Sequence, residues 1–236
     1  MELARELSTF SVLLIGFVLG LRHATEADHL AAVSTIVSEK KNLFTASIIG
    51  GLWGVGHTIS LFVVGLLVIF LKLQISESVE AKLEAVVGLM LVILGLNVLR
   101  KLFQAEKIHV HTHEHDGHTH MHIHTHHDEA AEKSHHSFSP RSVIVGMIHG
   151  LAGSAALMLL VVPTISSPVL AMTYILVFGV GSIGGMMVMS LLIGLPFHFT
   201  ASRFDILNKG IRLCSGVFSM GLGAMIIYEK LVQSRG

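Results

Sequence analysis

The sequence has little charge of either sign and only one cysteine. Charged residues make up 14% of its 236 positions, whereas a typical soluble domain carries about 25%. The single cysteine, Cys214, excludes a disulfide within the chain and a metal cluster held by several thiolates. The charges cancel to a formal net charge of zero, so the composition does not predict nucleic acid as a partner.

Apolar sequence, by contrast, is abundant. Hydrophobic residues make up 52% of the chain, and the mean hydropathy is +0.70. A helix needs about 20 apolar residues to cross the hydrocarbon of a bilayer, and a lone strand cannot satisfy its backbone there. We therefore predict an all-α, polytopic membrane protein with six transmembrane helices. The spans are expected at about 10–37, 43–71, 83–103, 142–163, 168–196 and 210–229.

Glycines recur at a nearly constant offset between the two halves of the chain. The matches are Gly16 and Gly20 with Gly146 and Gly150, then Gly50, Gly56 and Gly65 with Gly179, Gly185 and Gly194, and finally Gly88 and Gly95 with Gly216 and Gly223. Three spans per half is an odd number, so the halves would insert with opposite orientation, as in many transporters. We predict two inverted three-helix repeats, residues 1–103 and 142–236.

The connection between the halves, residues 104–141, has a different composition. It is polar and holds twelve histidines, many of them at alternate positions. Such a segment cannot bury a core, so we expect it to be disordered without metal and to buffer ions, Zn²⁺ among them, at many weak sites. The candidate buffering residues are His109, His111, His113, His115, His118, His120, His122, His124, His126 and His127.

The distribution of lysine and arginine predicts the orientation in the membrane. Ten of these residues flank the spans on the side that holds residues 104–141, and five flank them on the other side. Basic residues in short loops favour the cytoplasmic side. We therefore expect a multi-pass protein of the plasma membrane, with the histidine-rich loop in the cytoplasm and both termini outside.

Ionisable residues cluster inside the first apolar span, from Arg22 to His29. Each costs about 2.5–3.5 kcal/mol at the centre of a membrane helix, so they should face protein, water or an ion. Histidine and carboxylate together suit divalent nickel, cobalt or zinc. The alternative is a pair of buried histidines whose hydrogen bonds are satisfied by Asp28 and Glu26.

The spacing within this cluster constrains its geometry. His23, Glu26 and His29 form a slanted stripe along one side of a helix, whereas Asp28 falls about 140° from His23. A straight helix therefore cannot direct His23, Asp28 and His29 at one ion. Either the helix is unwound here, or Asp28 orients a ligand imidazole instead of binding the ion.

Two further histidines lie inside the apolar spans. His57 is flanked by Gly54 and Gly56, which would let another helix approach closely, and His149 begins the fourth span. Each could equally be an ordinary hydrogen-bonded histidine of the core or of the membrane interface. The candidate metal ligands are thus His23, Asp28, His29 and His57, with Glu26 and His149 as weaker members.

The segment Arg22-His-Ala-Thr-Glu-Ala-Asp-His29 resembles the signature of the nickel/cobalt transporter (NiCoT) family, in which histidine is followed after four residues by Asp-His. Leu52-Trp-Gly-Val-Gly-His-Thr-Ile59 is similar to the family's Leu-Gly-His motif. His149-Gly-Leu-Ala-Gly-Ser-Ala-Ala156 resembles the equivalent stretch of shorter, urease-accessory (UreH-like) membrane proteins. The resemblance covers essentially all six spans.

This resemblance implies transport of Ni²⁺ or Co²⁺, with His23, Asp28 and His29 recognising the metal and His57 contributing from the next helix. Two features depart from the family. Its full-length members have eight spans, whereas this chain has room for six. The histidine-rich loop is unusual for dedicated importers and is similar to that of nickel/cobalt efflux proteins, so the direction of transport stays open. A homo-oligomer, a nickel chaperone or a urease-maturation protein also stays open as a partner.

We therefore predict a nickel transporter and not an enzyme. Because imidazole must be deprotonated to bind metal, affinity should fall as the pH drops through about 6.5. A membrane protein that stores or delivers nickel without transporting it is the alternative. An intramembrane hydrolase is disfavoured because the spacing yields no nucleophile–base–orienter set around Ser154, and anion export is disfavoured because Arg22 is the only clear cation within the spans.

Overall fold

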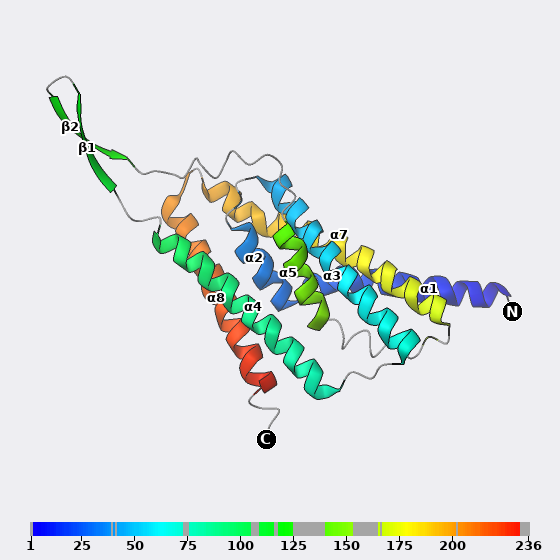
Figure 1. The fold of residues 1–236 in the computed structure, drawn as a ribbon. Coiled ribbons are helices and arrows are strands. Elements are labelled where there is room, and N and C mark those ends of the chain that lie inside the picture. The colour runs from blue at the N-terminus through cyan, green and yellow to red at the C-terminus, as the bar shows by residue number, and fades with distance from the viewer. Residues whose placement is uncertain are drawn as a thin grey trace.

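The computed structural model describes residues 2–38, 40, 42–72, 76–104, 109–115, 118–124, 140–152, 165, 167–201 and 203–231. Its helices are α1 (Glu2–His23), α2 (Ala27–Val37), α3 (Leu43–Leu71), α4 (Glu77–Gln104), α5 (Pro140–Ala152), α7 (Pro168–Ala201) and α8 (Asp205–Leu231). Two strands, β1 (His109–His115) and β2 (His118–His124), lie between α4 and α5. Figure 1 shows the helices as one bundle, from which the two strands project.

The prediction of a polytopic helical membrane protein is confirmed. Helices α3, α4, α7 and α8 are each long and apolar enough to cross a membrane. The pair formed by Thr9–His23 and α2 passes the same test when taken together, although it is bent by 54°. The expected fourth span, 142–163, is described only as far as the end of α5, so the count of six spans stays a prediction.

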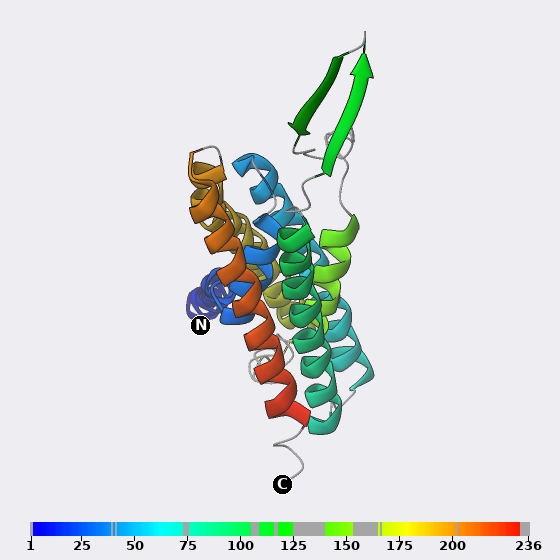
Figure 2. The same ribbon diagram turned by 90° about the vertical axis from the view of Figure 1, so that its left-hand side faces the viewer.

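The bundle is built from helices that are distant in sequence. Helix α3 packs against both α5 and α7, α1 packs along α7, and α4 packs along α8. Helix α2 is short and contacts α3, α4, α7 and α8. Figures 1 and 2 show it in the interior of the bundle, with α4 and α8 side by side along one flank.

Glycines allow the closest of these approaches. A Cβ at Gly88 would lie 2.7 Å from the carbonyl oxygen of Gly223, and one at Gly95 would lie 2.5 Å from that of Gly216. Small residues let the backbones of membrane helices touch in this way. The predicted repeat pairs Gly88 with Gly216 and Gly95 with Gly223, so the two contacts exchange when the halves are exchanged. This reciprocity supports the inverted repeats, which stay a prediction.

The core lies around α2, and the outer surface is apolar. Ala31, Ala32 and Val37 of α2 are buried with Leu91 of α4 and Met186 of α7. Many large apolar side chains instead point outward; examples are Phe10, Ile93, Val169 and Val217. In a bilayer these side chains would contact lipid, whose tails are as apolar as they are.

The histidine-rich connection was expected to be disordered without metal, but the structure contains two strands within it. Strands β1 and β2 pair antiparallel, with His109, His111, His113 and His115 opposite His124, His122, His120 and His118. Valine, threonine and isoleucine, which favour strands, occupy several of the intervening positions. In the sequence the two strands are separated by Asp116-Gly117, a dipeptide that is typical of two-residue hairpin turns. The remaining candidates, His126 and His127, lie outside the described residues.

Candidate metal centre

A break between α1 and α2 creates the candidate centre. Helix α1 ends at His23, and two hydrogen bonds close a tight turn: Thr25 N donates to Arg22 O at 2.8 Å, and Glu26 N donates to His23 O at 3.1 Å. Glu26 then takes an extended conformation at the start of α2. The turn brings the rings of His23 and His29 to a centroid distance of 4.3 Å. Of the two predicted explanations for the spacing, the structure shows an interrupted helix.

Histidines from two further helices complete the cluster. His57 comes from α3 and His149 from α5, and both lie against His29, with ring centroids at 5.4 Å and 4.2 Å. His23, His29, His57 and His149 are all at most 1% exposed. A Cβ at Gly150 would lie 2.5 Å from the carbonyl oxygen of His57, so α3 and α5 meet almost backbone to backbone. That close packing sets His149 beside the first-half residues.

Asp28 links two of the four imidazoles. Its Oδ1 lies 3.0 Å from His29 Nδ1, and its Oδ2 lies 3.0 Å from His149 Nε2. Oδ1 also accepts a hydrogen bond from the backbone N–H of His29 at 2.9 Å. Asp28 is in the first turn of α2, where the helix dipole favours a carboxylate. Asp28 thus bridges two of the candidate ligand imidazoles, an arrangement that fits the second of the two predicted explanations, and its role toward an ion stays a prediction.

Glu26 has a peripheral place in the cluster. Its Oε2 lies 3.0 Å from His23 Nδ1, as a contact without hydrogen-bond geometry, and its side chain is 42% exposed. It belongs to neither of the two groups of candidate ligands described below. A carboxylate beside the far nitrogen of an imidazole is the usual way to orient a metal-binding histidine. We therefore interpret Glu26 as a residue that positions His23.

Two groups of side chains in the described part of the chain are close enough to hold a metal ion. One consists of His23, His29 and His57, and the other of Asp28, His29 and His149. Within each group, one ligand atom per residue lies within 4.8 Å of the others. Both groups contain His29. The structure thus brings together the four main sequence candidates and His149.

The nitrogens of the first group are arranged toward one another. His23 Nε2 and His57 Nε2 are 3.2 Å apart, and His29 Nε2 is buried without a hydrogen-bond partner. Two nitrogens bound to one tetrahedral ion at the usual lengths lie about 3.4 Å apart. The two Nε2 atoms are therefore spaced much as neighbouring ligands of one ion would be.

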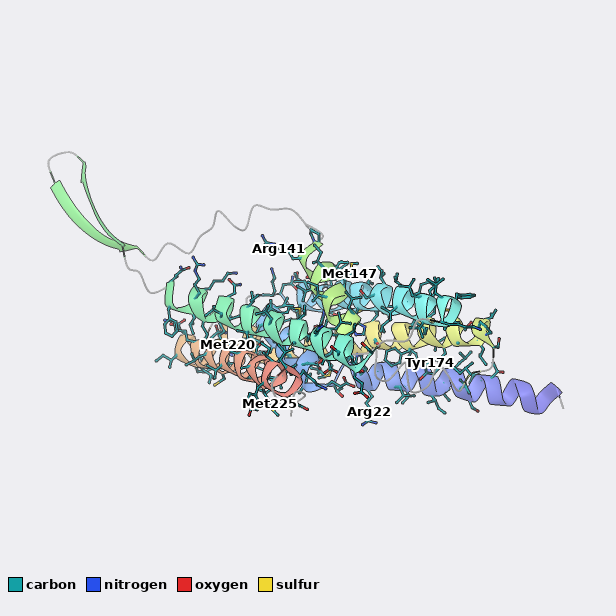
Figure 3. All side chains as sticks on the ribbon, turned by 60° about the horizontal axis from the view of Figure 1, so that its bottom comes forward. Arg22, Arg141, Met147, Tyr174, Met220 and Met225 are labelled. Atoms are coloured by element: carbon teal, nitrogen blue, oxygen red, sulfur yellow. The ribbon has the colours of Figure 1, made fainter. Side chains whose placement is uncertain are left out.

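Other ionisable candidates lie elsewhere. Figure 3 shows Arg22 on the outside of the bundle. It shows Arg141, at the start of α5, on the outside as well. Arg22 is exposed, so it does not share the interior with its neighbour His23. Strands β1 and β2, which carry eight of the loop histidines, project away from the bundle in Figures 1 and 2.

Aromatic residues around the cluster were not predicted. Trp53 packs against His29 and His149, with ring centroids at 5.2 Å and 5.4 Å, and its Nε1 is buried without a hydrogen-bond partner. Phe178 of α7 packs against His23 at 5.5 Å. Trp53 precedes His57 by four residues, one helical turn, which is the signal that could have identified it. Phe178 carries no such signal.

The fold and the cluster define a helical membrane protein with a buried histidine–aspartate centre. A family model described as "Cytochrome C biogenesis protein transmembrane region" matches residues 29–225, and the chain belongs to this family. One relative of the chain is the urease accessory protein UreH of Bacillus sp. (strain TB-90), which is 39% identical over 95% of this chain and 93% of UreH. The resemblance to UreH-like proteins is thereby confirmed. No solved structure matches the chain.

More distant relatives come from Arabidopsis thaliana. Chloroplast proteins FOR GROWTH AND FERTILITY 2 and 1 are 25% and 24% identical over 91% and 90% of this chain. The chain spans just over half of their lengths, 55% and 57%. The common membrane unit is therefore part of larger proteins in that plant.

Proposed function

We propose that this protein transports Ni²⁺ across the plasma membrane through the buried centre formed by His23, Asp28, His29, His57 and His149. The observation that carries the proposal is the clustering of four fully buried imidazoles and a carboxylate at a break in a membrane-spanning helix pair. Substrate sites of secondary transporters are typically built at such interrupted helices. The direction of transport is left open.

The chemistry of the cluster supports a cation as substrate. Buried polar atoms cost free energy unless they have partners, yet His29 Nε2, His57 Nδ1 and His149 Nδ1 lack hydrogen-bond partners in the described part of the chain. Imidazole nitrogens and one carboxylate suit borderline divalent ions. Nickel is the favoured ion because the relative UreH is named as an accessory protein of urease, a nickel enzyme; Co²⁺ would fit the same ligands.

The histidine-rich segment would serve as a capture site for the same ions on the cytoplasmic side. Its paired strands place eight histidines opposite one another in four pairs. Neutral imidazoles at this density bind nickel, cobalt and zinc. We infer that this segment concentrates the metal, while the buried centre selects and moves it. No residue is assigned a catalytic role, since transport needs none.

A second function is favoured by one observation. The relative UreH is named as an accessory protein, which fits a membrane protein that binds nickel and hands it to a maturation partner without moving it across the bilayer. In that case the buried centre would bind metal, but no net flux would follow. Binding and flux must therefore be measured separately.

Flux of nickel-63 into proteoliposomes tests the proposal. The wild type should accumulate the isotope, His23→Ala should abolish accumulation, and replacing the loop histidines should leave it measurable. His198→Ala is the matched control, because His198 is an exposed histidine of α7 outside the cluster. Nickel bound by the purified wild type without any flux would reject the transporter and favour the delivery function.

A further inference from the structure

His29 is shared by two groups of candidate ligands, and its ring stands between them. Its Nδ1 lies at the carboxylate of Asp28, 3.0 Å away, while its Nε2 is buried and unpartnered. The rings of His23 and His149 contact it at nearly equal centroid distances, 4.3 Å and 4.2 Å. In the described part of the chain, no ring contact or hydrogen bond joins His23 to His149. The cluster therefore has two ends, His23 and His149, and His29 lies closer to both of them than His57 does, whose ring centroid is 5.1 Å from that of His23 and 6.1 Å from that of His149.

We propose that the ion occupies two adjacent positions in turn, and that these positions share His29. The three-histidine position consists of His23, His29 and His57. The aspartate position consists of Asp28, His29 and His149. This inference rests on the proposed transport function and adds to it a division of the centre into two binding positions, of which only one uses a ligand from the second half of the chain.

The two positions exclude each other because a neutral imidazole has only one nitrogen with a free lone pair at a time. When His29 binds the ion through Nε2, its Nδ1–H donates to Asp28. When it binds through Nδ1, the ion lies on the side of Asp28 and His149. One ion per protein is therefore expected, and not two. Binding at the aspartate position displaces the protons that now bridge Asp28 to the imidazoles, as metal binding to such ligands generally releases protons.

The two positions differ in charge and in origin. The three-histidine position is neutral and uses residues of the first half only, from α1, α2 and α3. The aspartate position carries one negative charge and takes His149 from α5, in the second half. An ion that moves between them crosses the interface of the halves, where alternating-access transporters have their substrate sites. Several adjacent, individually weak positions also allow an ion to leave as well as enter.

The test separates binding from transport and uses chains in which the twelve histidines of 109–136 are replaced by serine, so that only the buried centre binds. We would measure nickel stoichiometry and nickel X-ray absorption spectra on purified His149→Ala, His57→Ala and the control His198→Ala, and nickel-63 flux in proteoliposomes. His149→Gln is a second variant in case the alanine variant does not fold.

One ion should bind in each variant. His149→Ala should show imidazole ligands without a carboxylate, His57→Ala should show a carboxylate with fewer imidazoles, and flux should fall in both by roughly tenfold or more relative to His198→Ala. Two ions per chain, or a His149→Ala spectrum and flux equal to the control, would overturn the inference. Shifted spectra without flux in any protein would reject transport alone and keep the two positions.

Discussion

Two carboxylates near the break between α1 and α2 lie beside two histidines of the cluster. Glu26 lies beside Nδ1 of His23, and Asp28 lies beside Nδ1 of His29. In both pairs the carboxylate faces Nδ1 of the imidazole, which leaves Nε2 without a carboxylate beside it. Metal-binding histidines are commonly fixed in this way, and the carboxylate also raises the basicity of the imidazole. We expect the acidic residues of the motif to prepare its histidines for an ion in the same way.

Substituting Asp28 tests this role most directly. In Asp28→Asn the side chain keeps its size, but the amide offers one acceptor oxygen and one donor nitrogen, so it cannot accept from both His29 and His149. Nickel affinity should fall by about 10- to 100-fold, as measured by equilibrium binding to purified protein without the loop histidines. Asp205→Asn is the control, because Asp205 is exposed at the start of α8. Equal affinities in the two variants would contradict an orienting role.

Gly150 tests whether close packing of α3 and α5 positions the cluster. A Cβ there would meet the backbone of His57 at 2.5 Å, so Gly150→Ala should push the helices apart. Overpacking of this kind costs about 1–3 kcal/mol, and we expect lower thermal stability together with weaker nickel binding. Gly221→Ala is the control, since nothing lies within 4 Å of its added methyl.

Gly221→Ala should be neutral or slightly stabilising, because alanine favours a helix over glycine by about 1 kcal/mol. Thermal unfolding in detergent, followed by circular dichroism, would measure both variants. If Gly150→Ala were as stable as Gly221→Ala and bound nickel normally, the contact between the two backbones would not set the geometry of the centre.

At the scale of elements, the break between α1 and α2 follows from residue spacing. His23, Asp28 and His29 cannot face one point from a straight helix, and this mismatch predicted either an interruption or an orienting aspartate. The structure shows the interruption, and Asp28 bridges two of the imidazoles. The sequence did not decide the place of His149, because that depends on how α5 packs against α3 through Gly146 and Gly150. Such contacts between distant segments leave no local pattern.

The hairpin shows the opposite limitation. The composition of residues 104–141 indicated disorder, but composition takes no account of the sequence in which the residues follow one another. The alternation of histidine with valine, threonine and isoleucine has the period of a strand, and Asp116-Gly117 separates two stretches that each carry histidine at every second position. In the observed register every histidine of β1 has a histidine of β2 opposite it. Alternate positions of a strand share a face, so these eight positions belong to one face of the hairpin.

Shifting the phase of β2 tests whether this pairing matters for metal capture. Exchanging the residues within the pairs 118/119, 120/121 and 122/123 keeps composition and length but moves three histidines to positions of the other face. Nickel binding by the loop should weaken by roughly tenfold if paired strands organise the ligands. The measurement is calorimetric titration of the full chain carrying His29→Ala.

The matched control exchanges whole pairs instead, placing residues 118–119 after 120–121, which keeps every histidine in phase. A disordered loop with many weak sites would bind nickel equally in both variants, because the number and density of histidines are the same. That result would reject the hairpin as the capture site and return the segment to its expected role as an unstructured buffer.

At the scale of the whole molecule, the packing is reciprocal. Helix α1 packs on α7 as α5 packs on α3, while α3 meets α7 and α4 meets α8. If α1 corresponds to α5, α3 to α7 and α4 to α8, each of these four contacts maps onto another of them or onto itself. The glycine offsets predicted this correspondence. The glycine offsets alone do not show that the centre is asymmetric. That asymmetry follows from the motif from His23 to His29, which has no copy in the second half.

The orientation of the molecule in the membrane is the remaining prediction, and its lone cysteine makes it testable. Cys214→Ser gives a background without thiols, into which Ser76→Cys or Thr112→Cys can be introduced. Ser76 is exposed between α3 and α4, and Thr112 lies in β1, at the opposite end of the bundle (Figure 1). Basic flanks place the hairpin in the cytoplasm, so a membrane-impermeant maleimide should label Ser76→Cys in intact cells and Thr112→Cys only after permeabilisation. The unsubstituted background should stay unlabelled throughout. Labelling of Thr112→Cys in intact cells would invert the topology and place metal capture outside the cell, which would make the hairpin a device for uptake and not for cytoplasmic buffering.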